Sequence, residues 1–139
     1  MMECYVDGSC PDPGGRSIGW AYYMTGDGID ICERGSERVF PPRRATSALA
    51  EYIAMVVALQ RLVEVGKPAM VMSDSCLVMN HLTGKWEFSS PSLEDLYRRC
   101  KELASMLPSV EFKWVARSEP GILRVNGLMR EWKKAAAND

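Results

Sequence analysis

Short apolar runs separated by turn signals occupy the first third of the chain. The pattern predicts a strand over residues 2–6 that ends at Asp7. Residues 18–24 and 29–34 flank an Asp-Gly pair at 27–28, which is a strong signal for a two-stranded hairpin. The chain is therefore predicted to open with three antiparallel strands.

The hydrophobic pattern then changes to helical spacing. Apolar residues recur every three or four positions over 47–65, and Gly66 follows where a helix cap belongs. A second amphipathic helix is predicted over 93–107, with Ser92 at its N-cap and Asp95 as the capping partner three residues later.

Two shorter apolar runs complete the predicted strands. Residues 69–72 indicate a central strand covered on both faces, and residues 110–115 indicate the last strand. Helices are predicted over 76–82 and, near the end of the chain, over 125–132. The order β-β-β-α-β-α-α-β-α, with right-handed crossovers between parallel strands, predicts a three-layer α/β domain.

Composition and charge set limits on the class of protein. The chain has 139 residues, of which 47% are hydrophobic and 25% charged, so we expect one globular domain over residues 1–139. A net charge of -1 supplies no general field that attracts a polyanion. No run is apolar enough for a membrane span or a secretion signal, and the five cysteines include no CxxC pair. We expect a cytoplasmic protein with no membrane partner, and a monomer by default.

Three carboxylates occupy positions that suit a shared site. Asp7 and Asp74 follow predicted strands, where open α/β sheets bind their ligands, and Glu51 lies on an apolar stripe of a predicted helix. A buried carboxylate needs a cation or hydrogen bonds, and oxygen ligands suit Mg²⁺ and Mn²⁺. Each residue taken singly also fits an ordinary role, namely a turn, a helix cap and a solvated helix face.

Together with their neighbours, these residues resemble the successive motifs of type 1 ribonuclease H. The resemblance extends over nearly the whole chain and implies a ribonuclease H-like fold, in which helices flank a five-stranded mixed sheet of order 3-2-1-4-5. It rests on Asp7-Gly8-Ser9-Cys10, Pro13-Gly14-Gly15, Gly19-Trp20, Thr46 to Tyr52, Ser73-Asp74-Ser75, Gly84-Lys85-Trp86 and Lys113 to Arg117.

The resemblance also implies an activity. Members of this family are metal-dependent endoribonucleases that hydrolyse the RNA strand of RNA/DNA hybrids and leave 3′-hydroxyl and 5′-phosphate ends. Their metal ligands match Asp7, Glu51 and Asp74, and two Mg²⁺ or Mn²⁺ ions would activate water and stabilise the leaving oxygen. The expected partner is therefore an RNA/DNA hybrid, and the expected cofactor is a pair of divalent ions.

The fourth carboxylate of the family is replaced in this chain. The matching residue is Asn126, which keeps an oxygen ligand and removes one negative charge, so we expect weaker metal binding at one position. Asn126 also fits an ordinary role at the start of a helix. An irregular loop over 118–125 leaves open that Glu119 or Glu131 approaches the site instead. His81, the single histidine, is expected to have an ordinary surface or core role, whereas members of the family often carry a histidine in the loop before the last helix.

Family resemblance further implies residues that hold the substrate. Gly8, Ser9 and Cys10 would border the RNA strand near the scissile phosphate, while Thr46 and Ser47 would contact a DNA phosphate. Such a substrate is recognised by its shape and its 2′-hydroxyls, so we expect weak sequence preference.

Two further substrate residues each have an ordinary alternative. Arg44 adds positive charge or lies in a solvated loop, and Trp86 lies beside the DNA strand, as in relatives, or anchors the edge of the core. Ala48 and Cys76 replace an asparagine and a glutamine of the family. The basic protrusion of some bacterial members is not evident in residues 80–92, so a modest number of phosphate contacts is expected.

Two other functions stay open. The replaced carboxylate, Ala48 and the missing loop histidine suit a catalytically weak or inert nucleic-acid-binding domain of the same fold, although a pure binder gains nothing from three carboxylates that face phosphate. A nuclease of the wider superfamily that cuts DNA junctions is disfavoured by the hybrid-type Asp-Gly-Ser and Thr-Ser motifs.

Overall fold

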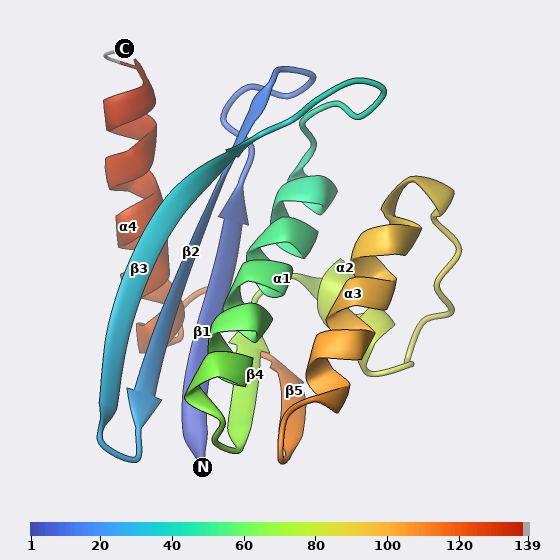
Figure 1. The fold of residues 1–139 in the computed structure, drawn as a ribbon. Coiled ribbons are helices and arrows are strands. Elements are labelled where there is room, and N and C mark those ends of the chain that lie inside the picture. Colours follow the sequence, from blue (N-terminus) through green and yellow to red (C-terminus); the bar gives the residue numbers. More distant parts are fainter. Residues whose placement is uncertain (138–139) are drawn as a thin grey trace.

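A five-stranded mixed sheet forms the centre of the protein in the computed structural model, which describes residues 1–137 (Figure 1). The strands run in the order β3-β2-β1-β4-β5, so the predicted order is confirmed. The elements are β1 (Met2–Ser9), β2 (Ser17–Gly26), β3 (Ile29–Arg38), α1 (Ser47–Val65), β4 (Ala69–Ser73), α2 (Cys76–Leu82), a 3-10 turn (Pro91–Leu93), α3 (Glu94–Ser105), β5 (Val110–Trp114) and α4 (Pro120–Ala137). The last two residues of the expected 1–139 domain lie outside the described residues.

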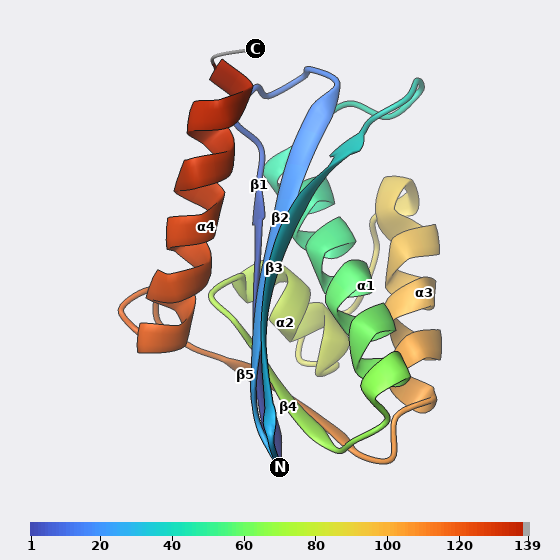
Figure 2. The same cartoon turned by 60° about the vertical axis from the view of Figure 1, so that its left-hand side comes forward.

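Helices cover the two faces of the sheet unequally. Figure 2 shows α1, α2 and α3 on one face and α4 alone on the other. The larger core lies under α1, where Tyr52 and Leu59 are fully buried, and a smaller core under α4 contains Ile122 and Val125. No helix within residues 1–137 is both long and apolar enough to cross a membrane.

The three opening strands are longer than their sequence pattern predicts. The hairpin between β2 and β3 turns at Asp27 and Gly28, whose positive φ angles of 52° and 81° match the predicted Asp-Gly turn. Strand β1 does not end before Asp7 as predicted, because Asp7 pairs with Ala21 and the ladder continues to Ser9. Asp7 therefore extends from within a strand, where backbone pairing on one side holds it in place.

Two predicted helix starts are wrong. Ser92 lies inside the 3-10 turn rather than at the N-cap, because Pro91 begins that turn and α3 starts only at Glu94, without a side-chain cap. Helix α4 begins at Pro120 rather than at residue 125, since proline lacks the N–H that the first helical turn leaves unpaired. Most of the segment expected to be an irregular loop is therefore the first part of α4.

Candidate active site

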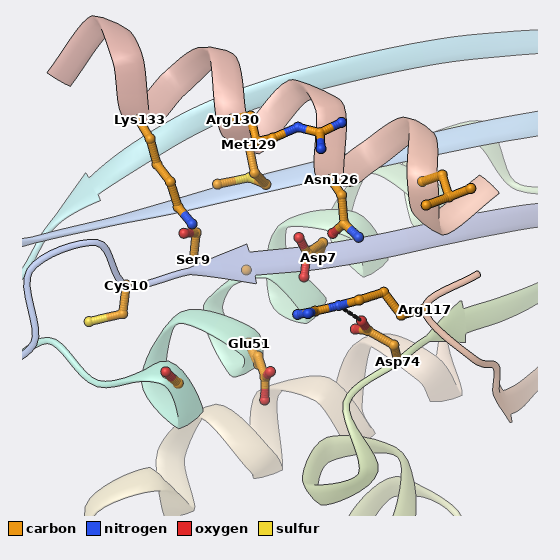
Figure 3. Close-up of a pocket in the computed structure, with 13 residues that line it drawn as sticks. Asp7, Ser9, Cys10, Glu51, Asp74, Arg117, Asn126, Met129, Arg130 and Lys133 are labelled. Atoms are coloured by element: carbon orange, nitrogen blue, oxygen red, sulfur yellow. Dashed lines mark ion pairs between the residues drawn. The ribbon is translucent and has the colours of Figure 1, made fainter. Parts of the chain in front are cut away.

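A cavity of about 530 Å³ opens where α1 and α4 approach the ends of β1 and β4 (Figure 3). Its lining includes Asp7, Glu51 and Asp74 together with Asn126. These four residues are far apart in the sequence and come from four different elements or their ends. They nevertheless face the same cavity. Asn126 lies in the second turn of α4, on the side that faces the carboxylates.

Strand register explains why two of the carboxylates are neighbours. β1 and β4 are parallel, and Tyr5 pairs with Met72. Asp7 lies two residues after Tyr5, and Asp74 lies two residues after Met72. The parallel register therefore places the two aspartates side by side. Glu51 comes from the first turns of α1, which packs directly over β1 at Gly8.

The carboxylates influence one another's ionisation. Burial raises the pKa of Asp7 to about 7, and the nearby charges of Asp74 and Glu51 add to this increase. Burial also raises the pKa of Glu51, against the hydrogen bond that the Ser75 hydroxyl donates to Glu51 Oε2 over 2.6 Å. Concentrated negative charge in a partly buried cavity is a setting that a cation stabilises.

Arg117 is a residue of this cavity to which the sequence pattern assigned no role. Its Nε lies 3.6 Å from Asp74 Oδ2, although the Arg117 side chain is 83% exposed. The indole of Trp114 donates a hydrogen bond to the backbone oxygen of Asp74 over 3.1 Å. The sequence could have indicated these neighbours only through the order of the strands. Trp114 ends β5 and Arg117 follows it, and β5 pairs with β4, the strand that Asp74 follows.

The donor set fits hard divalent cations, since it consists of three carboxylates and one amide oxygen. Within the described part of the chain, no three Asp, Glu, His or Cys side chains are grouped tightly enough to enclose an ion as they stand. Glu51 is turned toward Ser75 and Asp74 toward Arg117. Metal binding would therefore exchange these two contacts for metal–oxygen bonds while Asp7 keeps its place in β1.

The predicted substrate residues fall into three places. Gly8, Ser9, Cys10 and Ser47 line the same cavity as the carboxylates. Arg44 and Thr46 line a neighbouring cavity of about 420 Å³ at the start of α1. Trp86 lines neither cavity, is 49% exposed and packs edge-on against His81.

Thr46 also has a structural role. Its Oγ1 accepts a hydrogen bond from the backbone N–H of Leu49 over 3.0 Å, which caps the N-terminus of α1. The cap fixes where α1 starts and thereby the place of Glu51 one turn further along. Arg43 and Arg44 both line the second cavity. Arg43 forms an ion pair with Asp95 of α3.

Other residues considered for catalysis lie away from the carboxylates. His81 is buried in the core, and its Nδ1 is 2.6 Å from the hydroxyl of Tyr52. Glu119 lies directly before α4, with its Oε1 3.5 Å from the N–H of Gly121. Neither Glu119 nor Glu131 lines the cavity, whereas Asn126 does.

Known proteins resemble this chain in sequence. A family model described as "Reverse transcriptase-like" matches residues 6–120. A bifunctional protein of Mycobacterium tuberculosis is 31% identical over 112 residues, which cover 80% of this chain and 30% of that protein. Ribonuclease HI of Halobacterium salinarum is 35% identical over 104 residues, which cover 73% of this chain and 50% of that protein. The chain thus spans half or less of the length of these relatives.

Solved structures resemble it over nearly its full length. RNase H1 of Halobacterium salinarum has a TM-score of 0.71 at 30% identity and covers 91% of this chain and 92% of its own. The N-terminal RNase H domain of the Mycobacterium tuberculosis protein, solved as a fusion with maltose-binding protein, has a TM-score of 0.75 at 28% identity and covers 97% of each. LC11 RNase H1 in complex with an RNA/DNA hybrid has a TM-score of 0.75 at 21% identity, with 92% and 93% covered, a likeness of fold alone.

Proposed function

Because the chain belongs to the type 1 ribonuclease H family, we propose that it hydrolyses the RNA strand of RNA/DNA hybrids with the aid of divalent metal ions. The observation that carries the proposal is the convergence of Asp7, Glu51, Asp74 and Asn126 on one cavity. Relatives named as ribonuclease H support the choice of substrate. The proposed products carry 3′-hydroxyl and 5′-phosphate ends.

Asp7, Glu51, Asp74 and the amide oxygen of Asn126 would hold two Mg²⁺ or Mn²⁺ ions. When bound, such ions supply an activated water and stabilise the departing 3′ oxygen in an in-line displacement. Asp7 would be a restrained ligand, since its backbone pairs with Ala21 of β2 and its carboxylate is largely buried. Arg117 partly compensates the charge of Asp74 over 3.6 Å, and a divalent ion would supply that compensation when it is bound.

Backbone and hydroxyl groups beside the carboxylates would orient the RNA strand. Gly8, Ser9 and Cys10 form the wall at the end of β1, and Ser47 adds a hydroxyl at the start of α1. The second cavity, with Arg44 and Thr46, would hold a phosphate of the DNA strand. Contacts of this kind position a duplex by its backbone and carry little sequence information.

One assay tests the proposal directly. End-labelled RNA/DNA hybrid, RNA duplex and DNA duplex of one sequence are incubated with the protein in Mg²⁺ or in Mn²⁺. We expect cleavage of the RNA strand in the hybrid alone, loss of that cleavage with a chelator, and products that carry 3′-hydroxyl ends. Uncut hybrid in both metals would reject hydrolysis, and cleavage of the DNA duplex would reject the substrate class.

The replacement at Asn126 favours one alternative, a nucleic-acid-binding domain without turnover. One charge less reduces the attraction of the site for a second cation. The same assay separates the two functions when a binding measurement accompanies it, because the alternative predicts tight hybrid binding without any cut.

Restoring the carboxylate is expected to strengthen metal use. Asn126→Asp should lower the Mg²⁺ concentration for half-maximal cleavage by several-fold, because affinity rises with the number of charged ligands. The measurement is the cleavage rate over a Mg²⁺ titration, with Asn80→Asp as the control that adds the same charge beside a different cavity. An unchanged titration for Asn126→Asp would mean that residue 126 holds no metal.

A further inference from the structure

Helix α4 presents two cations to the carboxylate cavity. Asn126, Met129, Arg130 and Lys133 all line that cavity, and their spacing of three, four and seven residues places them on one stripe of the helix. Figure 3 shows Lys133 extending from α4 toward Ser9 at the end of β1. The stripe therefore continues the site from the metal-ligand positions along the helix.

These cations differ from the other basic residues near a carboxylate. Arg43, Arg61, Arg98 and Arg99 each form an ion pair with an acidic side chain. Arg117, in the same cavity, lies 3.6 Å from Asp74. Over the described residues, neither Arg130 nor Lys133 forms such a pair, although three carboxylates line the cavity. Positive charge that is exposed and not neutralised by the protein is available to a phosphate.

The charge of the rest of the protein makes these cations important. The chain has a net charge of -1, and residues 80–92 contain a single lysine and no arginine. Three carboxylates also repel the phosphates that must approach them. Cations in the same cavity offset this repulsion and draw a phosphate backbone toward the site.

We propose that Arg130 and Lys133 bind phosphates of the RNA strand next to the cleavage site. The assignment rests on the proposed function. It names the RNA strand because these cations share a cavity with the carboxylates that would cut it, whereas Arg44 and Thr46 line a separate cavity.

The first experiment measures binding without turnover. Each variant is made in an Asp7→Asn background, and its affinity for a fluorescein-labelled hybrid is followed by anisotropy over a series of salt concentrations. Lys133→Ala should weaken binding by roughly three- to tenfold and make the salt dependence shallower by about one counterion. Arg130→Ala should behave in the same way, and Lys133→Arg should restore the affinity.

Lys134 provides the matched control, because it is exposed on the same helix turn but does not line the cavity. Lys134→Ala should leave both affinity and salt slope unchanged. Equal effects of Lys133→Ala and Lys134→Ala would overturn the proposal, since they would show only a general effect of net charge.

A second experiment identifies the strand. A single neutral methylphosphonate is placed at successive positions of the RNA or the DNA strand. Binding is then compared between the protein with Lys133 unchanged and the Lys133→Ala variant, both in the Asp7→Asn background. We expect one RNA position at which the two proteins bind the modified hybrid equally. At that position the methylphosphonate has already removed the phosphate charge that Lys133 contacts. Equality at a DNA position would overturn the strand assignment. Neither result depends on cleavage, so failure of the proposed hydrolysis would be seen separately.

Discussion

Asp7→Asn is expected to abolish cleavage of RNA/DNA hybrids. The change removes the charge of a carboxylate that both Asp74 and Glu51 influence, while it keeps the size of the side chain and its place in β1. We expect a rate loss of roughly a thousandfold or more, which corresponds to about 4 kcal/mol of transition-state stabilisation. The measurement is the single-turnover rate in saturating Mg²⁺.

Asp30→Asn is the control, since Asp30 is exposed on β3 and lines none of the cavity. Its cleavage rate should equal that of the unchanged protein. Near-normal activity of Asp7→Asn would contradict the role of Asp7 as a metal ligand, whatever the behaviour of the control.

The same Asp7→Asn variant should be more stable than the unchanged protein in metal-free buffer. The pKa of Asp7 is about 7 in the folded protein and near 3.8 when exposed, so ionisation costs the folded state more than the unfolded state. The stability gain should be absent below pH 4, grow as pH rises toward 7, and level off above it, at a value on the order of 2 kcal/mol. Urea unfolding with a chelator at pH 4 and pH 8 measures it.

Added Mg²⁺ should reduce this difference at pH 8, because a cation stabilises the ionised carboxylate only in the folded, unchanged protein. A stability difference that is independent of pH would show that burial and the neighbouring carboxylates do not raise the pKa of Asp7.

Gly8→Ala is expected to have the largest effect on stability. A Cβ on Gly8 would overlap backbone atoms of Ala50 and Glu51, which cannot move without shifting α1 away from β1. We expect a loss of about 2–4 kcal/mol in the free energy of unfolding. Cleavage should also fall under conditions in which the variant is folded, since Asp7 and Glu51 lie on the two elements that are forced apart.

Gly127→Ala is the matched glycine control. The nearest atom to its new Cβ is a guanidinium nitrogen of Arg130 at 3.9 Å, and alanine favours the helix by about 1 kcal/mol. It should leave the protein as stable as before or slightly more stable. Chemical denaturation measures the free energy of unfolding of both variants. An unchanged stability of Gly8→Ala would contradict the close packing of β1 on α1.

The order of strands and helices was predictable because local pattern and propensity carry it. The Asp-Gly turn at 27–28 forms as expected, and α1 occupies the predicted 47–65. The predicted ends of strands and helices were wrong where strand pairing or helix capping, rather than the local hydrophobic pattern, decides where an element begins or ends. β1 continues to Ser9 through its ladder with β2, and α4 starts at Pro120 rather than at residue 125.

The sequence by itself determined which carboxylates were candidates, because three oxygen ligands followed or lay within strongly patterned elements that match a known family in order and spacing. Only the tertiary structure decided which cations face them. Arg117 meets Asp74 because β5 pairs with β4, and Lys133 reaches the cavity because α4 crosses the sheet beside β1. Such neighbours depend on strand register and on the direction in which helices cross, and these are set by packing between segments that no local pattern describes.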